Sequence, residues 1–190
     1  EDYLWYSAGG SACFTDFEKG FLGDVALQSR YIRGAFDDKP FTIGKYEHTR
    51  IRSAIAELAA NGGAPMGFYT RFEEPEARAE IVRYYRFIQE HESLIKGSRS
   101  HAEVLLLFPR REVHAGNVEA VNRFKQLGKE LLEAHVLFDV LPDDLATPER
   151  LADYRVVMKP EDSLDKLAPV TGKLTEIQAP KTVRVSASRS

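Results

Sequence analysis

Short apolar runs alternate with amphipathic helical patterns along the first hundred residues. The apolar runs predict β-strands at residues 3–6, 41–46 and 64–69. Apolar positions three and four residues apart predict helices at about 16–36, 50–60 and 75–96. Gly20 and Gly23 interrupt the first of these helices, which weakens that prediction. The strand–helix–strand order is the repeating unit of (β/α) barrels, in which all strands run parallel.

The second half of the chain repeats the alternation with more strongly apolar strands. Strands are predicted at residues 104–108, 136–140 and 155–159. Asn117 and Thr147 are placed to cap the helices between them. This βαβαβ order favours a doubly wound, flavodoxin-like parallel sheet. Three strands are too few for a finished domain of that kind.

The region after residue 160 loses the pattern. Residues 161–178 show no sustained period and are predicted to be a linker, whereas residues 182–187 alternate like a half-buried antiparallel strand. That strand has no partner hairpin, and the chain opens almost directly on an apolar strand. We therefore expect these residues to be a piece of a longer polypeptide.

Composition narrows the function classes. The chain has 190 residues and a formal net charge of −3, which gives no reason to expect nucleic acid or an anionic membrane as a partner. Cys13 is the single cysteine, so an internal disulfide and a CxxC zinc motif are excluded. The histidines lack metal-ligand spacing and no cofactor motif is present, so no cofactor is expected. We expect a soluble protein, with the cytoplasm as the favoured compartment.

Glu47 stands where the predicted strand at residues 41–46 ends. Barrel enzymes place catalytic groups at the carboxyl ends of their strands, and glycoside cleavage needs two carboxylates flanking the bond. Glu47 is therefore a candidate nucleophile or acid/base. The alternative is an acid that stabilises the start of the following helix. A second carboxylate is not evident, because Asp16, Glu73 and Glu74 fit helix starts equally well.

Aromatic side chains gather at the predicted strand ends. They are Trp5, Tyr6, Tyr46, Tyr69 and Phe72. Aromatic rings stack on the apolar faces of sugars, so these residues could line a carbohydrate cleft; buried packing is the alternative for each. Arg71 could bind an anionic or hydroxyl group, and His48 adjoins Glu47. Both also fit solvated surface positions.

The loop at residues 109–117 follows the first strand of the second unit. In a doubly wound fold such a loop faces ligands, and a helix beginning at Asn117 could hold a phosphate. The loop contains neither of the nucleotide-binding motifs GxGxxG and GxxxxGK[ST], so no sequence motif supports nucleotide binding here.

Several segments resemble a known family. Residues 50–66 read RIRSAIAELAANGGAPM, which is similar to a stretch near the barrel end of glycoside hydrolases related to the family 42 β-galactosidases. Residues 83–88, 102–108, 138–144 and 154–157 resemble the passage into, and the first part of, their amidotransferase-like trimerisation domain. The resemblance covers roughly residues 1–160.

The resemblance implies a TIM barrel, a flavodoxin-like middle domain and a small C-terminal β domain. Residues 1–97 would then be the last βα units of the barrel, residues 98–160 part of the middle domain, and residues 161–190 a linker and the start of the β domain. Glu47 falls near the strand that carries the nucleophile in this family. Family 42 proteins have a longer loop after that glutamate, whereas here His48 and Thr49 lead directly into the helix.

The resemblance also implies a function. We expect a glycoside hydrolase-like protein acting on β-linked sugars such as galactosides, assembled as a homo-oligomer (dimer or trimer), with its acid/base outside this chain. Two alternatives stay open. One is a noncatalytic oligomerisation or carbohydrate-binding module; the other is a small α/β domain that binds a phosphorylated ligand through residues 110–117.

Overall fold

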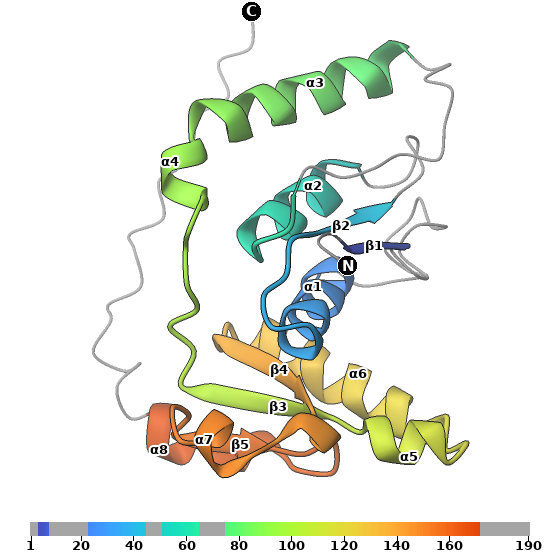
Figure 1. Cartoon of the computed structure of the whole chain (residues 1–190), viewed down its shortest axis with the longest axis vertical. Coiled ribbons are helices and arrows are strands. Elements are labelled where there is room, and N and C mark those ends of the chain that lie inside the picture. The colour runs from blue at the N-terminus through green and yellow to red at the C-terminus, as the bar shows by residue number, and fades with distance from the viewer. Residues whose placement is uncertain (1–3, 8–22, 45–50, 65–74, 172–190) are drawn as a thin grey trace, which may run out of the picture.

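Two parallel sheets and the helices around them make up the α/β structure shown in Figure 1. It is a computed structural model, which describes residues 4–7, 23–44, 51–64 and 75–171. Within those ranges one sheet has two strands, ordered β1-β2, and the other has three, ordered β4-β3-β5. All their pairings are parallel, as the strand–helix alternation predicts.

The first sheet pairs β1 (Leu4–Ser7) with β2 (Phe41–Gly44), in a register that joins Leu4 to Phe41 and Ser7 to Gly44. All four β2 residues are buried, as expected of a strand covered on both faces. The next segment joins the far side of β2, because the Ala64 N–H donates to the Phe41 carbonyl at 2.7 Å. The predicted strand at 64–69 otherwise lies outside the described residues.

Helix α1 (Asp24–Ala35) connects the two strands and starts later than the sequence pattern predicts. Gly23 adopts φ 101°, a left-handed conformation that a continuous helix through this position cannot contain. The predicted helix over 16–36 was therefore wrong across Gly23. Asp37 and Asp38 also have positive φ, at 52° and 55°, and form the predicted turn into β2.

Three further helices follow in the described residues of this unit. Helix α2 (Ile51–Ala60) ends before Gly62, whose φ of 82° reverses the chain as predicted. The helix predicted over 75–96 is in fact two, α3 (Pro75–Glu90) and α4 (Glu92–Ile95). His91 separates them with ψ 20°, outside the helical range. Ile55 of α2 packs against Ile81 of α3 in a small apolar cluster.

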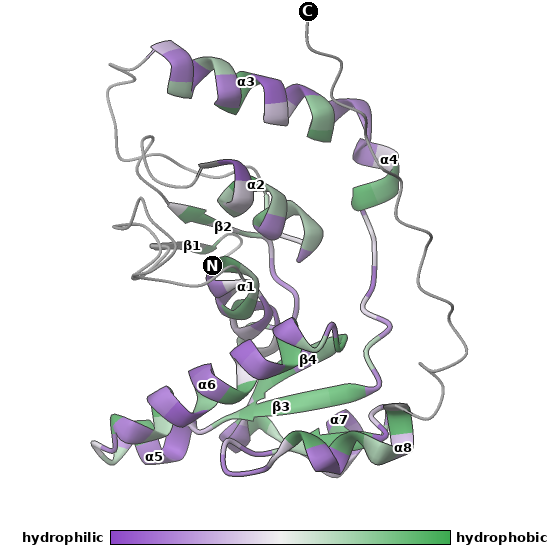
Figure 2. Ribbon diagram, turned by 180° about the vertical axis from the view of Figure 1, so that it is seen from behind, coloured by the Kyte–Doolittle hydropathy of each residue, from purple (hydrophilic) through white to green (hydrophobic). Residues whose placement is uncertain are grey.

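The second sheet comprises β3 (Val104–Phe108), β4 (Phe138–Pro142) and β5 (Val156–Met158), with β3 in the middle. Its strands β3 and β4 consist largely of apolar residues (Figure 2), and apolar side chains pack on both faces of the sheet. Helix α6 (Glu119–Glu133) packs on one face through Phe124, Leu127 and Leu131. The 3₁₀ helix η2 (Asp143–Leu145) and helix α7 (Pro148–Leu151) cover the other. Thr147 caps α7 as predicted, accepting from the Arg150 N–H at 3.4 Å.

Four predictions for residues 98–171 were wrong in detail. The loop expected at 109–117 contains helix α5 (Arg110–His114), and Asn117 does not cap α6, because its side chain donates to Glu112 instead. β4 begins at Phe138 rather than 136, after His135 with φ 54°. The expected linker contains η3 (Leu164–Leu167) and α8 (Ala168–Thr171). Leu167 of η3 and Val170 of α8 are buried in the apolar cluster of the three-stranded sheet, and this packing holds the two short helices in place.

Helix α1 contacts both sheets. Its Val25 and Ile32 belong to the apolar cluster around β1 and β2, whereas its Leu27 belongs to the cluster around β3 and β4. A Cβ atom at Gly34 would overlap the carbonyl oxygen of Val140 in β4, so the helix backbone lies directly against that strand. Helix α1 therefore contributes side chains to both apolar clusters, and the domain boundary at residue 97 stays a prediction.

Candidate functional site

The carboxyl ends of β1 and β2 meet at one edge, where the sequence places the candidate catalytic site. Ser7 and Gly44, the last residues of the two strands, are paired. Trp5 and Tyr6 lie within β1, opposite Thr42 and Ile43, although the positions of their side chains are not described.

The other predicted site residues lie outside the described residues. They are Glu47, Tyr46, Tyr69 and Arg71, together with His48, Phe72, Asp16, Glu73 and Glu74. Their arrangement stays a prediction, and the described structure contributes the parallel strand pair that leads to them.

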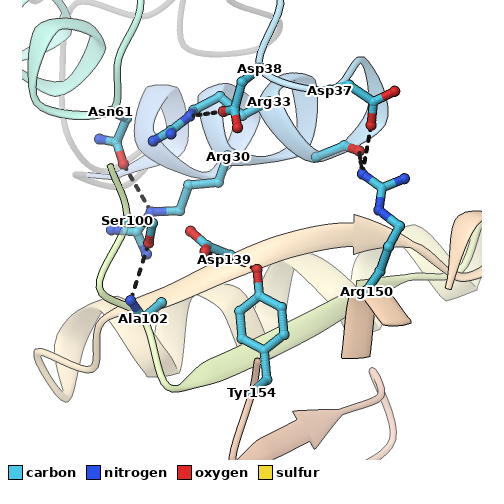
Figure 3. A network of polar contacts seen from close by, with 11 residues as sticks. Arg30, Arg33, Asp37, Asp38, Asn61, Ser100, Ala102, Asp139, Arg150 and Tyr154 are labelled. Atoms are coloured by element: carbon cyan, nitrogen blue, oxygen red, sulfur yellow. Dashed lines mark hydrogen bonds and ion pairs between the residues drawn. The ribbon is translucent and has the colours of Figure 1, made fainter. Parts of the chain in front are cut away.

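A second location became apparent only from the coordinates. A cleft of about 1260 Å³ lies between helix α1, the outer strand β4 and the segment that follows α4. Its polar wall includes residues distant in sequence, which Figure 3 shows together: Arg30, Ser100, Asp139, Arg150 and Tyr154. We refer to it as the α1–β4 cleft.

Arg30 is the central cation of the α1–β4 cleft. Its guanidinium lies over the Phe138 ring, 4.3 Å from the centroid, and its Nε donates to Asn61 Oδ1 at 2.9 Å. The Asn61 amide is itself oriented, because Nδ2 donates to the Glu57 carbonyl at 2.7 Å. Arg30 Nη1 is buried and has no hydrogen-bond partner. Burial lowers the pKa of Arg30 and the nearby Asp139 carboxylate opposes that effect, while the group stays charged as arginine does in proteins.

Asp139 and Tyr154 form the neighbouring part of the wall. Tyr154 Oη donates to Asp139 Oδ2 at 3.0 Å. Burial, followed by the Asp139 charge, raises the pKa of Tyr154 well above its ordinary value, so the hydroxyl stays a donor throughout the physiological range. Asp139 is thus a fixed acceptor on the same side of the cleft as the Arg30 guanidinium (Figure 3).

Ion pairs neutralise most of the remaining charge around the cleft. Arg33 Nε pairs with Asp38 at 2.7 Å, and Arg150 Nη2 pairs with Asp37 at 2.8 Å. Arg150 also donates to the Gly34 carbonyl at 3.2 Å, which ties α7 to the end of α1. These groups are therefore committed to holding the structure rather than to a ligand.

The carboxyl edge of the three-stranded sheet was the predicted phosphate site. Its donors are occupied by the chain's own carboxylates: Arg110 pairs with Asp144 at 2.7 Å, and the Arg111 N–H donates to Asp143 at 3.2 Å. The Arg110 hydrogen bond lowers the pKa of Asp144, so the pair persists at neutral pH. An incoming phosphate would have to displace these acids, which argues against the phosphate interpretation.

No family model, curated protein or solved structure matches this chain.

The described residues were compared with what a metal site and a membrane-spanning helix require. Within them no cluster of three or more histidine, cysteine or acidic side chains could hold a metal ion. Among those same residues, no helix has the length and apolar character needed to cross a bilayer.

Sequence reasoning missed the α1–β4 cleft because its residues come from parts of the chain that are far apart in sequence. Two local signals were present. Arg30 lies on an amphipathic helix between two buried residues, Ser29 and Ile32. Asp139 interrupts an otherwise apolar strand. Neither signal identifies the other residue as its neighbour, since that proximity follows from the packing of α1 on β4.

Proposed function

We propose that this chain belongs to a glycoside hydrolase-like protein that cleaves β-linked sugars, with Glu47 as the nucleophile. The supporting observation is the strand framework: β1 and β2 are adjacent, parallel and joined by α1, and the Ala64 N–H donates to the Phe41 carbonyl of β2. This is how consecutive barrel strands are arranged, and Glu47 follows the carboxyl end of β2. In the retaining mechanism Glu47 attacks the anomeric carbon and a second carboxyl group protonates the leaving oxygen.

The second unit agrees with the same proposal. The order β4-β3-β5 corresponds to second–first–third strand along the chain, which is how the flavodoxin-like order begins. A flavodoxin-like domain following barrel strands is what the family resemblance implies. Fold likeness does not establish chemistry, so the proposal depends on Glu47 itself.

Covalent labelling tests the nucleophile without requiring the second carboxyl group. A 2-deoxy-2-fluoro-β-galactoside with a 2,4-dinitrophenyl leaving group needs no protonation, because the dinitrophenolate leaves unaided. We expect the protein to gain the mass of one fluorosugar, and the peptide containing Glu47 to carry it in tandem mass spectrometry. Glu47→Gln should abolish labelling, since an amide cannot form the glycosyl ester.

Glu90→Gln is the matched control, because Glu90 is an exposed acid at the end of α3. Labelling of the control should equal that of the unmodified protein. Sugar attached to another peptide, or labelling retained in Glu47→Gln, would remove Glu47 from the chemistry.

A noncatalytic assembly module is the second candidate, and exposed apolar side chains favour it. Phe87 of α3 is 56% exposed and Leu94 of α4 is 75% exposed. Exposed apolar side chains of this size on adjacent helices are typical of protein–protein contacts. The labelling experiment separates the two proposals, because a purely assembling module takes up no fluorosugar at any residue.

A further inference from the structure

We propose that the α1–β4 cleft is a binding site for a neutral polyhydroxylated ligand, a short oligosaccharide, with Arg30 as hydrogen-bond donor and Asp139 as acceptor. The site is separate from Glu47, and the inference does not require Glu47 to be catalytic.

Unmatched polar groups in the cleft point to a ligand. The Arg30 Nη1 group has lost its water without gaining a partner in the protein, which is rare for a buried donor. Ser100 lies beside the guanidinium, on an exposed segment outside helices and strands (Figure 3). Because Nη1 is buried, a ligand acceptor in the cleft would reach it only after a local movement of the chain.

The local charge balance favours a neutral ligand over an anion. Arg33, Arg150 and Lys96 are paired with Asp38, Asp37 and Glu92. Arg99 also lines the cleft, but its side chain is exposed to solvent. Within the less exposed part of the wall, Arg30 and Asp139 are two opposite charges, close enough to affect each other but not in direct contact as an ion pair. A phosphate or carboxylate at Arg30 would be repelled by Asp139. Adjacent sugar hydroxyls, which both accept and donate, satisfy the two residues together.

Both groups are held in place before any ligand arrives. Asn61 and the Phe138 ring fix the plane of the Arg30 guanidinium, and Tyr154 fixes Asp139. Groups that are already oriented lose little conformational entropy on binding, so more of their interaction energy appears as affinity.

The size and opposite wall of the cleft suit more than one sugar ring. Its volume of about 1260 Å³ exceeds the roughly 300–1,000 Å³ of ordinary small-ligand pockets. Tyr85, Ile88 and Ile95, all partly buried, line its far side. Such side chains can contact the C–H face of a pyranose while its hydroxyls face Arg30 and Asp139.

Titration of the whole ¹⁵N-labelled chain with lactose and cellobiose, and separately with inorganic phosphate, tests the proposal. We expect saturable shifts of backbone amides around Gly34, Ser100 and Asp139 with at least one disaccharide. Arg30→Lys keeps the charge but loses the planar guanidinium, and Asp139→Asn keeps an acceptor for Tyr154. Each should weaken disaccharide binding by at least about tenfold, because a hydrogen bond to a charged group is lost.

Two controls isolate the cleft. Arg110→Lys changes an arginine at the carboxyl edge of the three-stranded sheet, and Glu47→Gln changes the proposed nucleophile; both should leave the affinity unchanged. A response to phosphate but not to sugars overturns the proposal, as does no response to either disaccharide up to about 100 mM, a very weak affinity. The proposal is also overturned if Arg30→Lys and Asp139→Asn both bind the disaccharide with the affinity of the unmodified protein. If the unmodified protein binds a disaccharide but takes up no fluorosugar, the catalytic proposal alone is refuted.

Discussion

Glu57 shows how a single residue can stabilise an element to which it does not belong. It lies on α2, and its Oε2 accepts from the Ala26 N–H at the start of α1 at 3.0 Å. Gly23, at the N-cap position, supplies no side-chain cap, so Glu57 replaces one. Burial raises the pKa of this carboxyl group, although the backbone N–H groups of α1 partly oppose the shift.

The raised pKa of Glu57 predicts a pH-dependent stability. The folded protein binds this proton more tightly than the unfolded chain, so the stabilising effect is fully present below the unfolded pKa and is lost as the pH rises through the folded value. Glu57→Gln keeps one acceptor and does not titrate. The melting temperature of Glu57→Gln minus that of the unmodified protein should therefore increase as the pH rises from about 4 toward 7.

Differential scanning calorimetry across that pH series measures the effect, with Glu90→Gln as the exposed control. The other titrating groups cancel in the difference. A difference that falls as the pH rises would show that the backbone N–H groups stabilise the charged carboxylate more than burial disfavours it.

Helix α1 illustrates, at the scale of an element, what the sequence could and could not predict. Spacing of apolar residues was enough for α2 and β3, because each has a plain period and clear stop signals such as Gly62. It failed at Gly23, where a backbone angle overrides the apolar pattern, and at residues 164–171, where two buried side chains order a weakly patterned segment.

For the candidate site around Glu47, the sequence predicted which kinds of residue stand near the strand ends, but not how their side chains are arranged. The α1–β4 cleft depends instead on tertiary packing. Its key contact, Arg30 over Phe138, joins residues more than a hundred positions apart, with no shared motif.

Replacement of Gly34 by alanine tests the packing of α1. Gly→Ala inside a helix normally stabilises by about 1 kcal/mol. Here the added methyl group would overlap the Val140 carbonyl, which is rigid backbone, so we expect a loss of at least about 2 kcal/mol in the free energy of unfolding. Urea denaturation followed by circular dichroism measures it.

Gly128→Ala in α6 is the matched comparison for Gly34→Ala. Its Cβ would lie 2.8 Å from Leu27 Cδ1, the end of a flexible side chain that can move. The loss should be clearly smaller than at Gly34. Equal losses at both positions would mean that α1 can shift away from β4 at little cost.

At the scale of the whole molecule, the shared helix couples the two units. Tyr31 packs against both apolar clusters and contacts Phe108 at 4.6 Å between ring centroids. Arg150 fastens α7 to Gly34 and Asp37. Separating the units would expose both clusters at once, so we do not expect either to unfold independently.

Cooperative unfolding gives this coupling a direct test. Trp5 of β1 is the single tryptophan, so its fluorescence reports on the first sheet, whereas far-ultraviolet circular dichroism reports on the whole chain. The two thermal transitions should coincide. Gly34→Ala should separate them, with the fluorescence transition moving to lower temperature. An earlier fluorescence transition in the unmodified protein would contradict the coupling.

The contact between Gly34 and Val140 also bears on the risk of aggregation. Open strand edges recruit strands from other molecules, and proteins commonly protect such edges by covering them. Helix α1 occupies the outer side of β4, so no foreign strand can add there while the helix is docked. Any extension of this sheet, by more of the same polypeptide or by another molecule, has to proceed from β5.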